Sequence, residues 1–206
     1  MSGSALHRNA GPVAVAAGGF LAATDLALLA MTNPQDRIAQ LLDPVFRVVN
    51  AGYFLTFVAL AVGLVAVHGA TAERTGRFGL VAFLVALTGT MAQGGNMWFD
   101  GFAAPWLADV APQVFTAERS VILQVGALSS YLLFALGWVL VGIALLRVRV
   151  VPVVVGLALV AGGVLGFGSG IPPYGVPIGL AVAALGGWLV HLDRAARRTA
   201  VVSAAR

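Results

Sequence analysis

The sequence contains no cysteine and no lysine, and charged residues make up only 10% of its 206 positions. The missing cysteines exclude disulfides, thiolate catalysis and cysteine-ligated metal sites. An ordinary globular domain is roughly 25% charged, whereas hydrophobic residues here reach 60% before the 26 glycines are counted. A soluble domain of this size has too little interior to bury so much apolar surface. The composition therefore predicts a protein that folds in lipid.

Common catalytic and phosphate-binding motifs are also absent. The chain has no GxxxxGK[ST], HExxH or GxSxG pattern, which removes the usual P-loop, zinc-protease and serine-hydrolase assignments. No acidic cluster surrounds the histidines, His7, His68 and His191. A helix cap or a lipid headgroup contact is therefore favoured over metal ligation, and we expect no metal and no cofactor.

Long apolar runs are what the sequence does contain. A helix needs about 20 mostly apolar residues to cross the hydrocarbon core, and such runs lie near 12–32, 48–68, 78–98, 121–146, 151–170 and 174–192. The connections are too short for a separate soluble domain. The sequence thus predicts an all-α, polytopic membrane helical bundle of six transmembrane helices, forming a single domain over 1–206. Because Asp25 interrupts the first run, we expect that helix to be retained rather than cleaved as a signal peptide.

The arginines predict the orientation of these helices. If both termini are cytoplasmic, the outer segments carry only Arg37, Arg47 and Arg119, and the other nine arginines lie on inner segments. This distribution follows the positive-inside tendency. We expect a multi-pass protein of the cell membrane whose positive charge contacts membrane lipid rather than nucleic acid. The sequence is also compatible with a homo-oligomer.

Polar side chains concentrate in the half of the bundle that this orientation places outside. The candidate site residues are Asp25, Tyr53, Gln93, Asn96, Trp98, Asp100, Gln124, Tyr131 and Trp138. Ionisable groups within a membrane usually face the bundle interior or a wet cavity, so we expect a pocket that opens toward the outer leaflet. The segment 99–120 is expected to cover it as a short interfacial helix broken by Pro105 and Pro112.

Two carboxylates in such a pocket suit acid–base chemistry. Asp25, and less strongly Asp100, are candidate general acids, because desolvation can keep a carboxyl group protonated near neutral pH. Tyr53, Trp98, Tyr131 and Trp138 could stabilise a cationic intermediate through their π faces. The alternatives are that both carboxylates form interhelical hydrogen bonds and that the aromatic residues belong to the interfacial belt.

Small residues recur every four positions in the last two predicted helices. The stripes are Gly162, Gly166 and Gly170 in one helix and Gly175, Gly179, Ala183 and Gly187 in the next. Small residues allow close helix approach in membranes. We therefore expect these two helices to pack against each other as a tight hairpin around Pro172 and Pro173.

Two resemblances add to this prediction. The stretch SSYLLFALGWVLVGIALLRVRVVPVVVGLALVAGGVLGF, Ser129 to Phe167, resembles the LF-G-L-L-R-P-G pattern of uncharacterised bacterial six-helix membrane proteins, which implies the fold. The size, the number of spans and the buried carboxylates are loosely similar to the small integral-membrane terpene cyclases. That likeness implies protonation of an alkene or epoxide by an acidic residue.

These observations lead to two functional hypotheses. The first is a membrane enzyme that cyclises or isomerises a hydrophobic, isoprenoid-like substrate, with Asp25 as the acid, Asp100, Asn96 and Gln93 orienting it, and the remaining candidates, Gln124 included, binding substrate. The second is a non-enzymatic lipid-binding, transport or accessory protein whose polar residues only hold helices together. Asp25→Asn distinguishes them, because it keeps shape and hydrogen bonding but removes the transferable proton.

Overall fold

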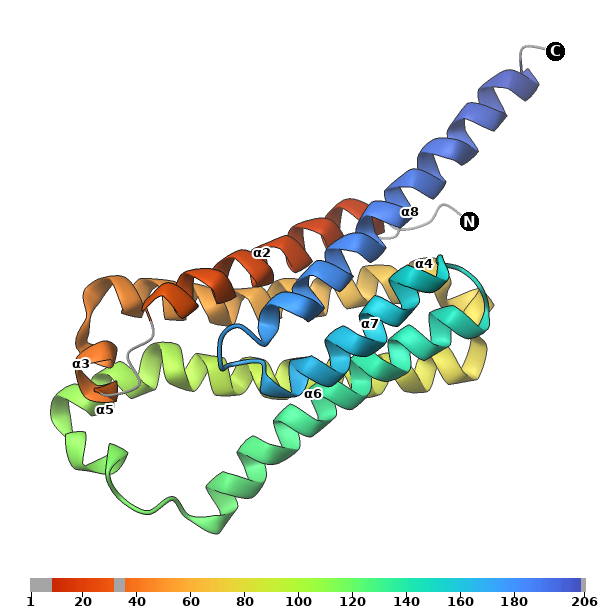
Figure 1. Cartoon of the computed structure of the whole chain (residues 1–206). Coiled ribbons are helices and arrows are strands. Elements are labelled where there is room, and N and C mark those ends of the chain that lie inside the picture. The colour runs from red at the N-terminus through yellow and green to blue at the C-terminus, as the bar shows by residue number, and fades with distance from the viewer. Residues whose placement is uncertain (1–8, 32–35, 205–206) are drawn as a thin grey trace.

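A computed structural model shows an all-helical chain whose main helices lie side by side in one elongated bundle (Figure 1). The structure describes residues 9–31 and 36–204, with side chains described as far as Ala196. Every regular element in these ranges is helical, which confirms the predicted all-α class. Four helices are long and apolar enough to cross a membrane, and they are Ala10–Met31, Pro44–Val110, Val121–Arg147 and Gly175–Ala196.

Helix α4 (Pro44–Trp98) consists of two antiparallel limbs. At Gly76 the backbone has φ 58° and ψ −149°, a conformation that glycine adopts without steric cost, and the chain doubles back there (Figure 1). The limbs coincide with the predicted spans 48–68 and 78–98. Asp43 is the N-cap of this helix, because its carboxylate accepts a hydrogen bond from the backbone N–H of Phe46 at 2.7 Å. Pro44 follows in the first turn, a position that proline favours.

The other predicted spans also fall on helices. They are α2 (Ala10–Met31), α6 (Val121–Arg147), α7 (Val153–Leu165) with the short 3₁₀ turn η3 (Gly166–Gly168), and α8 (Gly175–Ala204). Position 32, the predicted end of the first span, and Arg8 lie outside the described residues. Helix α8 continues past the predicted end at 192 and projects beyond the bundle (Figure 1).

Helix α7 is shorter than the predicted span 151–170. Its 13 residues rise only about 20 Å, less than the roughly 30 Å of a hydrocarbon core. The loop from Ser169 to Tyr174 therefore turns part of the way along the bundle, well short of the ends of α2 and α4 (Figure 1). A span prediction counts apolar residues and could not detect this, because the loop itself contains few polar side chains.

The segment 99–120 departs from the expected broken helix. Helix α4 ends at Trp98, as predicted for the third span, but the chain continues through a π-helical turn, η1 (Phe99–Ala103), into α5 (Ala104–Val110). Pro105 does not interrupt the chain, because it lies in the first turn of α5 directly after the π-helical turn, and a π-helical turn accommodates a local break in the regular bonding of a helix. Pro112 does mark a break and opens the 3₁₀ helix η2 (Pro112–Phe115).

The bundle has two distinct ends. One, here named the α3–α5 end, holds α3 (Arg37–Leu42), η1, α5 and η2, and α3 packs against α5. The other, here named the Gly76 end, holds the turn between the limbs of α4, the α6–α7 turn and the start of α2 (Figure 1). The described arginines divide between the elements of the two ends. Toward the Gly76 end, Arg74 and Arg77 flank Gly76, Arg147 and Arg149 lie at the α6–α7 turn, and Arg194 lies in the last part of α8. Toward the α3–α5 end, Arg37 begins α3, Arg47 lies in the first turn of α4 and Arg119 precedes α6.

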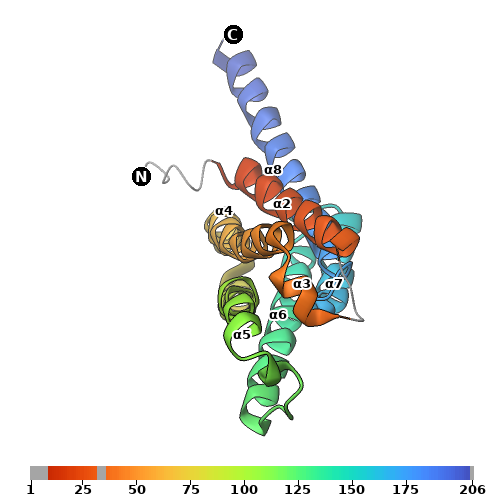
Figure 2. The same ribbon diagram turned by 90° about the vertical axis from the view of Figure 1, so that its left-hand side faces the viewer.

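Viewed along the bundle, α2 and α8 lie together, the limbs of α4 form one side, and α6 and α7 form the other (Figure 2). Large apolar side chains fill the centre. Tyr53, Phe57, Phe134 and Trp138 are all at most 1% exposed. Their rings follow one another with centroid separations of 5.5, 5.6 and 6.4 Å. The core thus contains a continuous chain of aromatic rings that joins α4 to α6.

Most residues of the two small-residue stripes lie at helix contacts, although Gly187 has open space around it, and most of the α8 stripe faces a different helix from the one expected. Gly162 of α7 does meet α8, where an added Cβ would lie 2.9 Å from Ile178 Cα. Gly179, in contrast, packs on α2, where its Cβ would lie 2.9 Å from the nitrogen of Ala22. The expected α7–α8 hairpin therefore exists, while the closest approach of α8 is to α2. Spacing along one helix identifies a contact face without identifying its partner.

Candidate functional site

Asp25 lies in the middle of a set of polar contacts between helices. Its side chain is fully buried. One carboxylate oxygen, Oδ1, accepts a hydrogen bond from the Tyr53 hydroxyl at 2.8 Å. The other, Oδ2, accepts from the backbone N–H groups of Gly175 and Val176 at 3.0 and 3.1 Å. These are the first residues of α8, so Asp25 caps the α8 N-terminus from another helix, where unpaired N–H groups and the helix dipole favour a carboxylate.

Two further hydrogen bonds join the loop before α8 to side chains of α4. The Gln93 side chain donates through Nε2 to the Ser169 carbonyl at 2.6 Å, and the Gly170 N–H donates to the Tyr53 hydroxyl at 3.2 Å. Irregular backbone at membrane depth is tolerated only where protein or water satisfies its polar groups. Asp25, Tyr53 and Gln93 therefore provide hydrogen bonds for the short loop.

A second polar contact joins α4 to α6. Gln93 Oε1 accepts from the Ser130 hydroxyl at 3.2 Å and from Asn96 Nδ2 at 3.3 Å. Asn96 Nδ2 also contacts Ser130 Oγ, and that hydroxyl has the Ala127 carbonyl within 2.7 Å. Gln93 and Asn96 were both predicted as site residues, and the structure brings them together. Ser130 was not among the candidate site residues, because a serine on an apolar helix carries no signal of its own.

Asp100 does not join Asp25. Its carboxylate lies 3.5 Å from Arg37 of α3, and the two side chains are 35% and 43% exposed. Its backbone carbonyl accepts a hydrogen bond from the Asn50 side chain at 2.8 Å. Asp100 thus belongs to the α3–α5 end, where it connects η1 to α3 and to the first limb of α4. The two candidate acids have separate partners and form no dyad.

The remaining candidate residues are dispersed. Trp98 is 50% exposed beside Phe102, and Gln124 is exposed and donates to the Arg119 carbonyl at 2.9 Å. Trp138 is buried in the aromatic chain of the core, away from Trp98 and Gln124. Tyr131 is half-buried, and its hydroxyl would lie 3.4 Å from a Cβ added to Gly170. Of the aromatic candidates, Tyr53 therefore bonds Asp25 directly and Tyr131 reaches the adjoining loop.

Three buried polar atoms in the described part of the chain lack a hydrogen-bond partner. They are Thr90 Oγ1, Trp138 Nε1 and Ser169 Oγ. Such atoms are few in native proteins. Trp138 is the one among them that the sequence analysis predicted as a site residue, and its indole N–H lies within the aromatic core.

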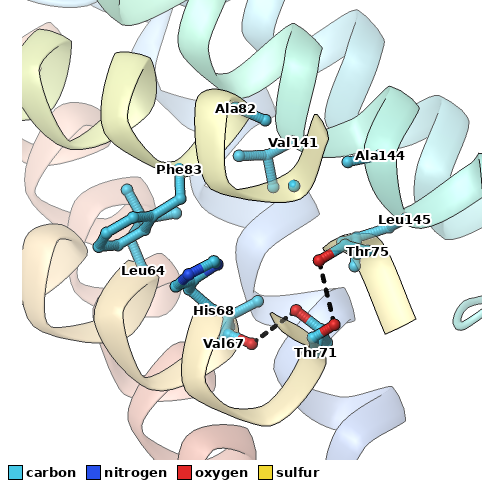
Figure 3. Close-up of a pocket in the computed structure, with 11 residues that line it drawn as sticks. Leu64, Val67, His68, Thr71, Thr75, Ala82, Phe83, Val141, Ala144 and Leu145 are labelled. Carbon is cyan, nitrogen blue, oxygen red and sulfur yellow. Dashed lines mark hydrogen bonds between the residues drawn. The ribbon is translucent and has the colours of Figure 1, made fainter. Parts of the chain in front are cut away.

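Two pockets in the described structure are lined by none of the predicted site residues. The first lies at the Gly76 end between both limbs of α4 and α6, and is a small cavity of about 20 Å³. Figure 3 shows His68, Thr71, Thr75 and Phe83 around it. His68 stacks on Phe83 with a centroid separation of 4.2 Å. The second pocket lies between Gly11 at the start of α2 and Val190 of α8. The expected pocket beside Asp25 is not one of these.

Metal binding has no support among residues 9–31 and 36–204, where no group of three or more histidine, aspartate or glutamate side chains gathers. Comparison with known proteins gives no further guide, because no family model, curated protein or solved structure matches this chain. The resemblances to bacterial six-helix membrane proteins and to terpene cyclases therefore stay predictions.

Proposed function

We propose that the chain is a multi-pass protein of the cell membrane with six spans and both termini in the cytoplasm. The two limbs of α4 provide two of the spans, and α7 with η3 provides the shortest. Support comes from the arginines, because five of the eight that lie in the described side chains are at the Gly76 end. A positively charged end is typical of the cytoplasmic side. The start of α2 and the described end of α8 lie toward this same end (Figure 1).

Within that membrane arrangement, we propose a non-enzymatic accessory role. The observation that carries this proposal is the set of three hydrogen bonds that the Asp25 carboxylate accepts from Tyr53, Gly175 and Val176. A general acid needs a proton directed at substrate within hydrogen-bond reach. At Asp25, the carboxylate accepts all three hydrogen bonds from donors within the protein. The Asp25 side chain also has no exposed surface. Asp25 acts in this proposal as a fixed anchor for α8.

The test compares wild type with Asp25→Asn, each purified from a host supplied with prenyl precursors. Mass spectrometry of the organic extract identifies what each protein retains or converts. We expect ordinary phospholipid in both samples and no converted isoprenoid in either. An isoprenoid that both proteins retain and only wild type converts would contradict the accessory role and identify Asp25 as an acid.

Acid-initiated cyclisation or isomerisation of an isoprenoid is the second candidate function. It is favoured by the unpartnered Trp138 indole N–H beside the buried aromatic chain that begins at Tyr53, the partner of Asp25. An aromatic wall next to an acid suits a carbocation. For this function Tyr53 must release Asp25, so Tyr53→Phe should alter turnover while leaving α8 anchored by two backbone bonds. Unchanged turnover in Tyr53→Phe would count against it.

A further inference from the structure

The start of α6 lacks a packing partner within the described part of the chain. In the stretch 121–129 every residue except Ala127 is exposed, and this part of α6 diverges from the other helices (Figures 1 and 2). The rest of the helix is packed. Ser130 bonds Gln93 of α4, and a Cβ added to Gly142 would lie 3.0 Å from the nitrogen of Val160 in α7. The start of α6 therefore continues two faces that are covered further along the same helix.

One of these faces follows α7 and then extends beyond it. Val139 lies on this face, because its nitrogen would be 2.7 Å from a Cβ added to Gly163 of α7. Alternating steps of four and three residues lead back from Val139 to a row of apolar side chains, here named the α6 seam. The α6 seam consists of Val121, Val125, Leu128 and Leu132, which are 74, 59, 50 and 52% exposed. Their spacing is that of a coiled-coil seam, which packs against a second helix.

In the membrane arrangement proposed above, the α7–α8 loop lies beside the α6 seam and within the hydrocarbon core. The ring centroids of Phe167 in η3 and Tyr131 in α6 are 6.2 Å apart, so η3 ends level with Tyr131. Tyr131 lies about 24 Å along α6 from its last residue, Arg147, and a hydrocarbon core is roughly 30 Å thick. The α6 seam thus begins to be uncovered at the depth where the chain turns from α7 to α8.

This loop has backbone groups that lipid cannot satisfy. In the described structure the carbonyl groups of Gly170 and Pro172 accept no hydrogen bond, and Ile171 between them is 61% exposed. Irregular backbone at membrane depth is tolerated only where protein or water covers it. The α6 seam beside the loop is apolar and unsuited to water. A further polypeptide is therefore the cover that suits both surfaces.

We propose that a second copy of this chain provides this cover, in a dimer whose two-fold axis runs along the membrane normal. The two α6 seams pair in parallel, and the start of each α6 lies over the α7–α8 loop of the other copy. A row of valine and leucine with this spacing is self-complementary, because the two-fold axis brings each residue to its own counterpart at the same depth.

The loop also offers a donor for such a pair. Tyr174 is 47% exposed, and its hydroxyl makes no hydrogen bond in the described structure, so it is free to donate to a carbonyl group of the other copy. Donor and acceptors on one surface again favour a second copy as the occupant. The proposal rests on the proposed membrane arrangement and is independent of the role of Asp25.

Cross-linking of single cysteines tests this contact, because the chain contains no cysteine of its own. Leu128→Cys lies in the α6 seam. Leu123→Cys is its matched control, since Leu123 is 56% exposed in the same stretch but lies on the side of α6 that faces α4 at Ser130. Each full-length variant is oxidised in membranes washed with alkaline carbonate. We expect a disulfide-linked dimer from Leu128→Cys and none from Leu123→Cys, because a disulfide requires Cα atoms within about 7 Å.

Larger side chains at the same two positions test the strength of the dimer. Wild type, Leu128→Trp and Leu123→Trp are purified in a mild detergent, and native mass spectrometry over a range of protein concentrations gives the dimer fraction. We expect a dimeric wild type. Leu128→Trp should raise the dissociation constant about tenfold, since tryptophan overpacks the interface in both copies. Leu123→Trp should stay within about twofold of wild type, and equal melting temperatures would show that both variants fold.

The alternatives give different results. Equal cross-linking at the two positions would mean random collision and would overturn the proposal. So would a Leu128→Cys product whose mass differs from that of a dimer, because another protein would then cover the α6 seam. A chain that resists carbonate but is monomeric would overturn the dimer alone, whereas a chain that carbonate removes would overturn the membrane arrangement as well.

Discussion

Polar side chains behave differently around the α7–α8 loop and around the pocket at the Gly76 end. At the loop, Asp25 and Gln93 reach across helices to backbone groups that no helix satisfies. At the pocket, Thr71 and Thr75 donate to carbonyl groups one turn earlier in their own helix, Val67 at 2.9 Å and Thr71 at 3.0 Å. The first kind of contact holds separate elements together, whereas the second leaves the space between helices open. The hydrogen-bond partner of a buried polar group therefore indicates the role of that group better than the mere presence of the group does.

The largest expected effect comes from Asp25→Ala. This change leaves the Tyr53 hydroxyl and the Gly175 N–H without their acceptor, whereas the Val176 N–H keeps the Pro173 carbonyl at 3.1 Å. We expect the free energy of unfolding to fall by about 2 kcal/mol, since each of the two unpaired buried groups costs roughly 1 kcal/mol or more. Equilibrium unfolding in mixed detergent micelles measures it. Asp109→Ala, which alters an exposed aspartate in α5, is the matched control and should change stability by less than about 0.5 kcal/mol. Equal losses in both variants would contradict the anchoring role.

The contrast between the two regions can be measured with Gln93→Leu and Thr71→Val. Gln93 bonds the Ser169 carbonyl and the Ser130 hydroxyl, so its loss should cost about 1–2 kcal/mol. Thr71 bonds only within its helix in the described contacts, and the helix carbonyl it reaches already has a backbone partner. Thr71→Val should therefore change the unfolding free energy by less than about 0.5 kcal/mol. The same unfolding assay compares them, and a reversed order would break the distinction.

The remaining prediction concerns the ion pair at the α3–α5 end, where the expected effect is small and depends on salt. Arg37 and Asp100 are separated by 3.5 Å and are both partly exposed, and pairs of this kind contribute from about 0 to 1 kcal/mol. Arg37→Gln should lower stability by less than about 1 kcal/mol, and the difference from wild type should shrink as salt is raised. A larger loss that persists at high salt would mean that α3 is a structural part of the bundle.

The helices were predictable because apolar length is a local property of sequence. Each predicted span overlaps a helix in the described residues, and the sharp reversal between two of the spans falls at Gly76, where only glycine adopts the required backbone without strain. The depth of the α7–α8 loop was not predictable, because nothing in the sequence of α7 states where its partners end. Pairing Gly179 with α2 likewise depends on the packing of distant segments.

The candidate site was predictable in composition and not in arrangement. Helical spacing put Gln93 and Asn96 on one face, and the structure joins them through Ser130. Asp25 was singled out because a carboxylate within an apolar run needs a partner. Its partners at Gly175 and Val176 are backbone N–H groups, which every sequence contains and no side-chain pattern marks. The sequence could therefore identify the residue without revealing that its hydrogen-bonding capacity is used within the fold.

The most direct test of the account is a double-mutant cycle between Asp25 and Tyr53, whose side chains are 2.8 Å apart. The unfolding free energies of wild type, Asp25→Ala, Tyr53→Phe and the double variant give the coupling energy of the pair. The account predicts a coupling of about 1 kcal/mol or more, because the bond fixes α2 to α4 beside the α8 N-terminus. Strictly additive losses would contradict the claim that Asp25 serves as an anchor among these helices.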